Sequence, residues 1–180
     1  MLANFFRRYT FKQKISLFLE DHLYFILGGL PSYEGILIRR IIYRLLFKRI
    51  GKASIIFVNT YFTHTFNIII GDYFAINCNS HLDGRGGIEI GDHVIIGPNV
   101  FIGSSNHVVA ADTGKPRMFL GHIPEPVKIG SNVWIGANSV ICPGAKIQDN
   151  SVIAAGSVVV GDIPASVLAA GNPAKIIKGI

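Results

Sequence analysis

The chain has 180 residues, which suits one domain with a small appendage. Hydrophobic residues make up 49% and charged residues only 16%, a composition that provides a continuous core and excludes a disordered chain. The net charge of +6 comes from residues 1–52, so residues 53–180 are close to neutral. We find no nucleic-acid-binding motif beside these cations. A basic, apolar segment fits helices packed on a core, and it also fits a membrane surface.

The two cysteines, Cys78 and Cys142, lie far apart and outside any metal-binding spacing. A disulfide framework is therefore not expected, and a reducing compartment is predicted. No stretch reaches the roughly 18 uncharged apolar residues of a membrane-spanning helix, and we see no secretory signal. We expect a cytoplasmic protein, with residues 1–48 suited to peripheral contact with the inner face of the membrane.

Residues 1–49 are expected to form a basic, apolar, helical N-terminal segment. Helical spacing of apolar residues predicts one helix over residues 12–27. An amphipathic helix is expected to begin at Pro31-Ser32 and to continue to Lys48.

A six-residue repeat follows this segment, and such repeats decide a fold. An aliphatic residue recurs at every sixth position in Ile129, Ile135, Ile141, Ile147, Ile153 and Val159. Small or aliphatic residues follow four places later in Val133, Ser139, Ala145, Ser151, Ser157 and Ile163. The same phase appears earlier at Ile70, Ile76, Ile90, Ile96 and Ile102, with weaker copies at Ile50 and Ile56.

A period of six fits a chain that runs straight for a few residues and then turns a corner, so that three sides make a coil of about 18 residues. Gly or Asn permits the backbone of the corners, and parallel hydrogen bonding stacks the coils at about 4.8 Å. Burying one inward Ile contributes roughly 1.5–3 kcal/mol. We predict an all-β core, a parallel β-helix over residues 50–168, and a C-terminal tail over 169–180 with a short helical turn from Ala174 to Lys178.

The repeat is interrupted twice. Residues 104–128 carry no hexad and contain several Gly and Pro residues, which predicts a long loop that leaves the coil. A shorter bulge is expected from Leu82 to Gly87, before the register resumes at Ile88.

Three motifs accompany the hexads: Asn132-Val133-Trp134-Ile135-Gly136, Ala154-Ala155-Gly156-Ser157-Val158-Val159 and Ala170-Gly171-Asn172-Pro173-Ala174-Lys175. Over roughly residues 50–180 the chain resembles the hexapeptide acyltransferases, most closely the galactoside and maltose O-acetyltransferases and the bacterial polysaccharide O-acetyltransferases. The segment Asp83-Gly84-Arg85-Gly86-Gly87 favours the polysaccharide branch. The resemblance implies a left-handed β-helix and a homotrimer with active sites between adjacent prisms. It also implies acetyl-CoA as acyl donor, with no metal.

The catalytic histidine of these enzymes ends the hexad before the long loop, a position that His107 holds here. A sugar hydroxyl is a poor nucleophile, and an imidazole with a reference pKa of about 6.5 is suited to remove its proton. We expect His107 to be the general base. The family commonly has an acidic residue or proline next, whereas this chain has Val108.

The resemblance implies a sugar contact at Asn77, with Asn79 nearby. Arg85 stands where the galactoside enzymes have a second, acidic acceptor contact, which argues against a galactoside-type acceptor. His81, close to Asp83 in the sequence, is a candidate to orient the acceptor. Implied contacts with coenzyme A are Trp134, Ala137, Ala155, Gly161, Lys175 and Lys178.

The predicted function is transfer of an acetyl group from acetyl-CoA to a sugar hydroxyl of a cell-surface glycan precursor. An antibiotic, an amino sugar or another small molecule remains an alternative acceptor, and a non-catalytic hexapeptide scaffold is the alternative of another class. A zinc site of the γ-carbonic-anhydrase kind needs two histidines five residues apart, a spacing that the chain lacks. His122, in the long loop, is a candidate to reach a neighbouring subunit's site.

Overall fold

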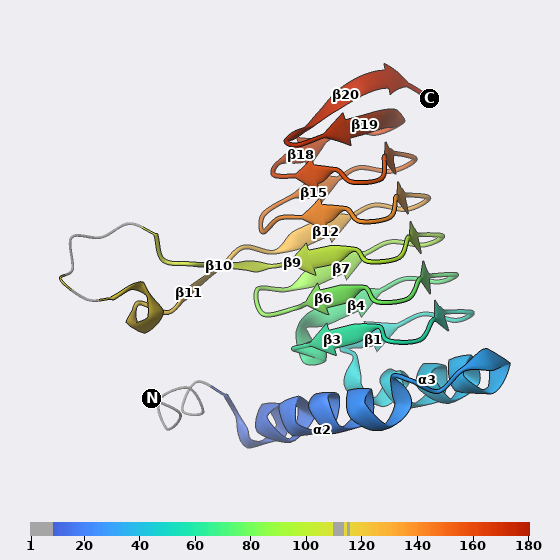
Figure 1. Ribbon diagram of the computed structural model, residues 1–180, viewed down its shortest axis with the longest axis vertical. Coiled ribbons are helices and arrows are strands. Elements are labelled where there is room, and N and C mark those ends of the chain that lie inside the picture. Colours follow the sequence, from blue (N-terminus) through green and yellow to red (C-terminus); the bar gives the residue numbers. More distant parts are fainter. Residues whose placement is uncertain (1–8, 110–113, 115) are drawn as a thin grey trace.

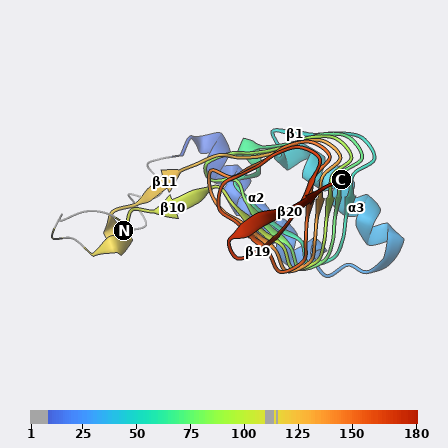
Figure 2. The same ribbon diagram turned by 90° about the horizontal axis from the view of Figure 1, so that it is seen from above.

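The computed structural model describes residues 9–109, 114 and 116–180. Short parallel strands wind into a column of stacked coils that stands on two helices, and a long arm leaves its side (Figure 1). From above, the coils superpose as a triangle with the arm at one corner (Figure 2). The predicted parallel β-helix with N-terminal helices is confirmed.

The three sides of the triangle are three sheets. Sheet A contains β1 (Arg49–Ile50), β4 (Ile68–Ile70), β7 (Ile88–Ile90), β12 (Val127–Ile129), β15 (Lys146–Ile147) and β18 (Asp162–Ile163). Sheet B contains β2 (Ile55–Ile56), β5 (Ala75–Ile76), β8 (Ile95–Ile96), β13 (Trp134–Ile135), β16 (Val152–Ile153), β19 (Val167–Gly171) and β20 (Ala174–Gly179). Sheet C contains β3 (Tyr61–Thr63), β6 (His81–Asp83), β9 (Phe101–Gly103), β14 (Val140–Ile141) and β17 (Val158–Val159). We name each corner by the sheets it joins, in chain order: AB, BC and CA.

The repeated aliphatic residues form the core. In sheet B, Ile56, Ile76 and Ile96 pair in register across the coils, and Ile135 and Ile153 continue the column. All five are buried. Each isoleucine therefore packs on the isoleucine of the next coil, which gives the thin column a continuous apolar interior.

Two helices close the base of the column (Figure 1). Helix α2 (Phe11–Leu27) begins at Thr10, whose side chain forms a capping box with Gln13. Helix α3 (Ser32–Leu46) packs under β2, while α2 packs under β3 and the short 3-10 helix η1 (Thr65–Asn67). Both helices lie close to their predicted positions.

A buried arginine joins this base to the first coil. The Arg39 guanidinium, fully buried, donates hydrogen bonds to the carbonyl oxygens of Ile56 (2.9 Å), Leu27 (3.1 Å) and Leu30 (2.8 Å). Burial lowers the pKa of Arg39, against a smaller opposing effect of Tyr43. The arginine therefore satisfies three carbonyl groups at the boundary between the helices and the first coil, where no further coil is present to bond them.

A ladder of side chains holds the AB corners together. Asp72 Oδ1 accepts from the backbone N–H of Lys52 (2.9 Å), and Asp92 Oδ1 accepts from that of Asp72 (2.7 Å). Ser131 Oγ accepts from Asp92 N (3.1 Å), and Asp149 Oδ1 accepts from Ser131 N (2.7 Å). Each coil therefore caps a backbone donor of the coil below it.

This ladder explains the glycine that follows many of the inward isoleucines. A Cβ on Gly51 would lie 2.3 Å from Asp72 Oδ1, and one on Gly71 would lie 2.3 Å from Asp92 Oδ1. Only glycine leaves room for the acceptor oxygen at this corner.

The C-terminus forms a hairpin on top of the column. Strand β20 pairs antiparallel with β19, from Gly171↔Ala174 to Val167↔Gly179. The short helical turn expected from Ala174 to Lys178 is wrong, because these residues extend sheet B. No helix within the described residues (9–109, 114 and 116–180) is both long and apolar enough to cross a membrane.

The three outer faces differ in chemistry. The outward residues of sheet A are mostly charged, with ion pairs Lys128–Glu89 (3.3 Å) and Lys146–Asp162 (3.8 Å). The outward residues of sheet B form an apolar stripe of Ile55, Ala75, Ile95, Trp134, Val152 and Leu168. The outward residues of sheet C are Tyr61, His81, Phe101, Val140 and Val158. Two of the three faces are therefore largely apolar.

Candidate active site

All departures from the hexad in the first three coils occur at the CA corner. The first coil inserts η1 there, the second inserts the predicted bulge at residues 84–87, and the third inserts the arm. The later coil turns the same corner directly, from Ile141 to Ile147. Because the coils are in register, these insertions lie above one another and build one site.

The arm itself is a two-stranded ribbon. Strand β10 (Ser105–His107) pairs antiparallel with β11 (His122–Pro124), and a 3-10 turn, η2 (Arg117–Phe119), lies toward its tip. The sequence predicted a long loop here but not its strands.

His107 ends β10 and is exposed. It pairs in register with His122 of β11, and the two rings lie 4.1 Å apart between centroids at an angle of 38°. The structure therefore places two imidazoles together on the arm, at the outer end of the β10–β11 pairing. An exposed imidazole nitrogen at this point can accept a proton from a bound hydroxyl group.

The base of the arm is locked to the bulge of the coil below. Ser104 Oγ donates to the Asp83 carbonyl (2.7 Å) and accepts from Gly86 N (2.8 Å). The backbone N–H of Glu125, on the returning strand, donates to the Ser104 carbonyl at 2.8 Å. A Cβ on Gly86 would lie 1.9 Å from the Ser104 carbonyl oxygen, so this contact requires glycine.

The Asp83 carboxylate anchors the bulge. It accepts hydrogen bonds from Thr63 Oγ1 (3.0 Å) and Arg85 N (3.1 Å), and its Oδ1 lies 3.0 Å from His64 Nδ1. Burial raises the pKa of Asp83, but the hydrogen bonds and the charge interaction with His64 outweigh it and lower the pKa to about 2. Arg85 Nε lies 3.9 Å from the other carboxylate oxygen. Asp83 is therefore ionised and positions Arg85.

His64 links this bulge to the N-terminal helices, a role that the sequence did not predict. It is buried, adopts a left-handed backbone (φ 55°), and places Nε2 3.0 Å from the Tyr9 hydroxyl. The buried Glu20 of α2 accepts from the backbone N–H groups of His64 and Thr65, each at 2.8 Å. A polar chain thus runs from α2 through η1 to the candidate acceptor residues. The only feature of the sequence that could have indicated this role is the position of His64 at the first CA corner.

His81 lies on the outer face of sheet C between two aromatic rings. Its ring centroid is 4.8 Å from that of Tyr61 and 5.4 Å from that of Phe101. Burial lowers the pKa of His81, opposed by the charge of Asp83, so the ring is neutral at pH 7. Its buried Nε2 has no hydrogen-bond partner among the described residues. Because this nitrogen is buried, a hydroxyl group of a ligand can bond it only when a neighbouring side chain moves aside.

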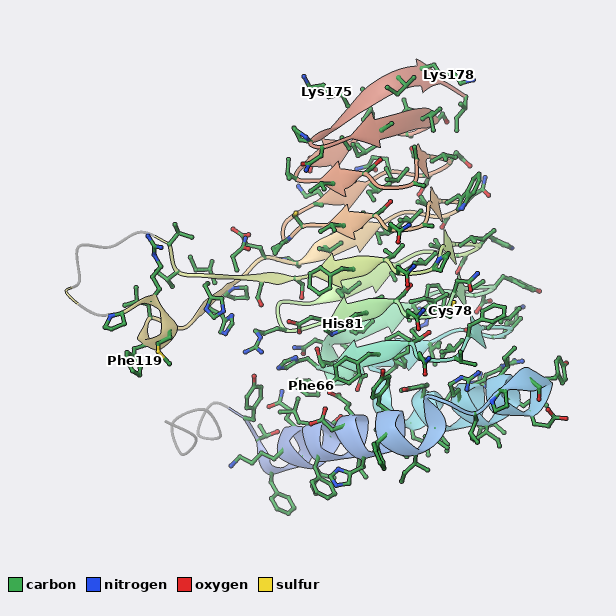
Figure 3. The ribbon with its side chains drawn as sticks, in the orientation of Figure 1. Phe66, Cys78, His81, Phe119, Lys175 and Lys178 are labelled. Carbon is green, nitrogen blue, oxygen red and sulfur yellow. The ribbon has the colours of Figure 1, made fainter. Side chains whose placement is uncertain are left out.

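The predicted site residues fall into two groups at opposite edges of sheet C. His107, Asp83, Arg85 and Gly161 lie at or beside the CA corner. Asn77 and Asn79 lie at the BC corner on either side of Cys78 (Figure 3), and His81 begins β6 just after this corner. Asn77 Oδ1 accepts from Cys78 N (2.9 Å), and Asn79 takes the positive φ of the corner.

Most predicted coenzyme A contacts lie on sheet B or at the BC corner. Trp134 points outward from sheet B and is 54% exposed. Ala137 and Ala155 lie one above the other at the BC corner, where Gly156 N donates to the Ala137 carbonyl (2.8 Å). Lys175 and Lys178 are exposed near opposite ends of β20 (Figure 3). One copy of the chain therefore does not bring these residues to His107.

A groove of about 680 Å³ lies above the base of the arm at the CA corner. Its lining includes Asn106 and Glu125 of the arm and Cys142 and Val160 of the coils above. Asn106 Nδ2 donates to Glu125 Oε2 at 3.0 Å. Among the described residues there is no cluster of three or more metal-ligating side chains.

Residues 126–161 match the family model of the bacterial transferase hexapeptide (six repeats). Galactoside O-acetyltransferase of Escherichia coli is 40% identical over 135 residues, which are 75% of this chain and 65% of that protein. The chain thus spans slightly less than two thirds of this curated relative. The putative colanic acid biosynthesis acetyltransferase WcaF of Escherichia coli is 29% identical over 78% of this chain and 74% of that protein.

A solved structure, a galactoside acetyltransferase in complex with coenzyme A, superposes with a TM-score of 0.84 at 33% identity. The superposition covers 94% of this chain and 83% of that chain. The likeness therefore includes the N-terminal helices as well as the coils.

Proposed function

Because this chain belongs to the hexapeptide-repeat transferase family, we propose that it transfers an acetyl group from acetyl-CoA to a sugar hydroxyl. The observation that carries this proposal is His107, exposed at the end of β10 above an anchored acceptor bulge. The similarity to a galactoside O-acetyltransferase and to a coenzyme A complex supports both substrates.

His107 acts as the general base. It removes the proton of the acceptor hydroxyl while that oxygen attacks the thioester carbonyl carbon, and a tetrahedral oxyanion forms. When the carbon–sulfur bond breaks, the imidazolium returns the proton to the departing thiolate. Arg85, which Asp83 positions beside the CA corner, and His81, whose Nε2 has no hydrogen-bond partner among the described residues, orient the acceptor. Direct transfer needs no covalent enzyme intermediate and no metal.

A homotrimer completes the site. Sheets B and C expose apolar stripes, whereas sheet A is charged, so packing sheet B of one copy against sheet C of the next buries both apolar faces. This contact brings the CA corner and arm of one copy to the Trp134 side of its neighbour. It thereby unites the two groups of site residues. Sedimentation should give a mass of three times 19.6 kDa, and Ile95→Asp should dissociate the trimer. A fully active monomer would contradict this assembly.

Thiol release from acetyl-CoA tests the catalytic assignment. His107→Ala should lower kcat by about 10²–10⁴-fold, the usual contribution of a general base, while binding of acetyl-CoA persists. The matched control is His93→Ala, which removes an exposed histidine at the AB corner, stacked on Tyr73. Full activity of His107→Ala would remove His107 from the mechanism. Failure of the unaltered protein to bind acetyl-CoA would favour a non-catalytic scaffold.

We propose a cell-surface glycan precursor as the acceptor. Arg85 in place of an acidic residue, and the similarity to the putative colanic acid acetyltransferase, support a polysaccharide substrate over a galactoside. A panel of oligosaccharides, simple galactosides, amino sugars and antibiotics in the thiol-release assay tests this. Preference for a small acceptor would overturn it.

Two free cysteines, Cys78 and Cys142, support a cytoplasmic location.

A further inference from the structure

The side of α2 and α3 that points away from the column carries a band of exposed apolar residues, which we call the apolar base. Its members are Phe11, Ile15, Phe18, Leu19, Phe25, Ile26, Tyr33, Leu37, Ile38, Ile41 and Leu45. Phe25 is 88% exposed and Leu45 is 83% exposed. Figure 3 shows side chains that project below both helices, away from the coils. A contiguous apolar surface of this kind marks an interaction site.

The helical spacing places this band opposite the buried faces. In α3, the column side buries Arg39, Tyr43 and Leu46, while Leu37 and Ile41 project from the other side. The same opposition holds in α2, whose Glu20 and Leu27 are buried. The opposite faces of the two helices already make the contacts with the first coil. The apolar base is therefore not needed to attach the helices to the column.

Cations border the apolar base. Arg40 and Arg44 follow one another at helical spacing beside the apolar stripe of α3, and Lys48 is exposed two residues past the end of the helix. None of the three has an ion-pair partner among the described residues. Lys12 is exposed at the start of α2. The base is thus an apolar surface with an unpaired positive rim.

Two of the three carboxylates on these helices bond groups of the column instead of facing the apolar base. Glu20 is buried and accepts backbone hydrogen bonds from η1. Asp21 accepts a hydrogen bond from the Tyr61 hydroxyl of β3 at 2.6 Å. Glu34 accepts one from Ser32 in the first turn of α3. Glu34 is exposed and is the only one of these three carboxylates on the side of the apolar base, so the rim of Lys12, Arg40, Arg44 and Lys48 keeps an excess of positive charge.

We propose that the apolar base binds the surface of a bilayer that contains anionic lipids. The aromatic and aliphatic side chains would enter the boundary between head groups and acyl chains, and the arginine and lysine rim would meet the lipid phosphates. A second copy is a poorer occupant, because base-to-base pairing would bring the two positive rims together. The lateral faces used in the proposed trimer stay free of this contact, so three bases can lie on one membrane.

This contact sets the height of the arm. The arm leaves the third coil, two coil spacings of about 4.8 Å above the first, and the helical layer adds about 10 Å. His107 would then act about 20 Å above the lipid surface. Membrane binding is separate from acetyl transfer, so it can be measured without catalysis.

Vesicle co-sedimentation with the full chain tests the proposal. Binding to vesicles of phosphatidylcholine with phosphatidylglycerol should exceed binding to pure phosphatidylcholine by at least about tenfold, and salt should weaken it. Phe25→Glu with Leu45→Glu should abolish binding, and Arg44→Gln with Lys48→Gln should weaken it about tenfold. These residues are exposed, so circular dichroism and thermal melting should match those of the unaltered protein.

Two control variants carry the same changes elsewhere. Ile180→Glu alters an exposed apolar residue at the opposite end of the column, and Lys128→Gln with Lys146→Gln removes two cations from sheet A. Both should bind vesicles normally. No binding, or equal and salt-insensitive binding to pure phosphatidylcholine, would overturn the proposal. Self-association through the base, seen as a doubled mass that Phe25→Glu with Leu45→Glu abolishes while vesicles stay unbound, would assign the surface to a second copy.

Discussion

Gly86→Ala tests whether the bulge holds the arm in place. A Cβ at this position would lie 1.9 Å from the Ser104 carbonyl oxygen and 2.8 Å from Glu125 N. Ordinary contact begins at 3.4 Å, so the arm or the bulge must shift by about 1.5 Å. Neither segment can shift without breaking hydrogen bonds, because Ser104 is fully buried and bonds both of them.

The expected loss follows from the bonds that the shift would break. They are the hydrogen bonds from Gly86 N to Ser104 Oγ, from Ser104 Oγ to the Asp83 carbonyl, and from Glu125 N to the Ser104 carbonyl. At about 1 kcal/mol each, stability should fall by about 2–3 kcal/mol. Displacing the catalytic base by more than 1 Å should also lower kcat by about 10²-fold.

Urea unfolding and the thiol-release assay measure the two effects. Gly29→Ala is the matched control, because a Cβ there meets nothing within 4 Å. This control should stay within about 0.5 kcal/mol of the unaltered protein and keep its activity. If Gly86→Ala behaves like Gly29→Ala, the bulge does not position the arm, and the account of the CA corner is wrong.

Two further predictions concern the polar chain beneath the site. Glu20→Gln replaces a buried charged acceptor of two backbone N–H groups, so the free energy of unfolding in urea should fall by about 2–3 kcal/mol, and an unchanged midpoint would contradict the role of Glu20. The fold lowers the pKa of both His81 and Asp83, so the unfolded state binds more protons on acidification. The melting temperature should therefore fall as the pH drops below about 6.5, where His81 takes up a proton on unfolding, and again between about pH 4 and 2. In the second range, protonation of Asp83 removes about 2 kcal/mol from the free energy of unfolding. A melting temperature that Asp83→Asn leaves equally sensitive between pH 4 and 2 would argue against the second step.

The isoleucine repeat was sufficient to predict the column from sequence. A residue such as Ile135 has one role, inward packing, and that role repeats at a fixed interval. The long loop and the bulge were predicted because they interrupt this interval. The first insertion, η1, was not predicted, because Ile68 and Ile70 are both inward and keep an aliphatic pattern through it.

The contacts across coils could not be predicted. The pair His64 and Asp83 depends on the register Thr63↔Asp83, which is known only once the coil length is known. The β20 hairpin was missed because its partner, β19, carries a hexad pattern that gives no sign of an antiparallel neighbour. The grouping of His107 away from Trp134 likewise follows from which corner each occupies, not from their spacing along the chain.

A stack of identical coils has no inherent limit to its growth. Its last coil offers unpaired backbone groups on which the first coil of another molecule could continue, as in a fibre. Here β20 runs antiparallel and presents Lys175 and Lys178 at that end, while α2 and α3 cover the other. The protein is thereby stopped at a fixed length, and removing β20 alone would convert a discrete particle into a candidate for end-to-end polymerisation.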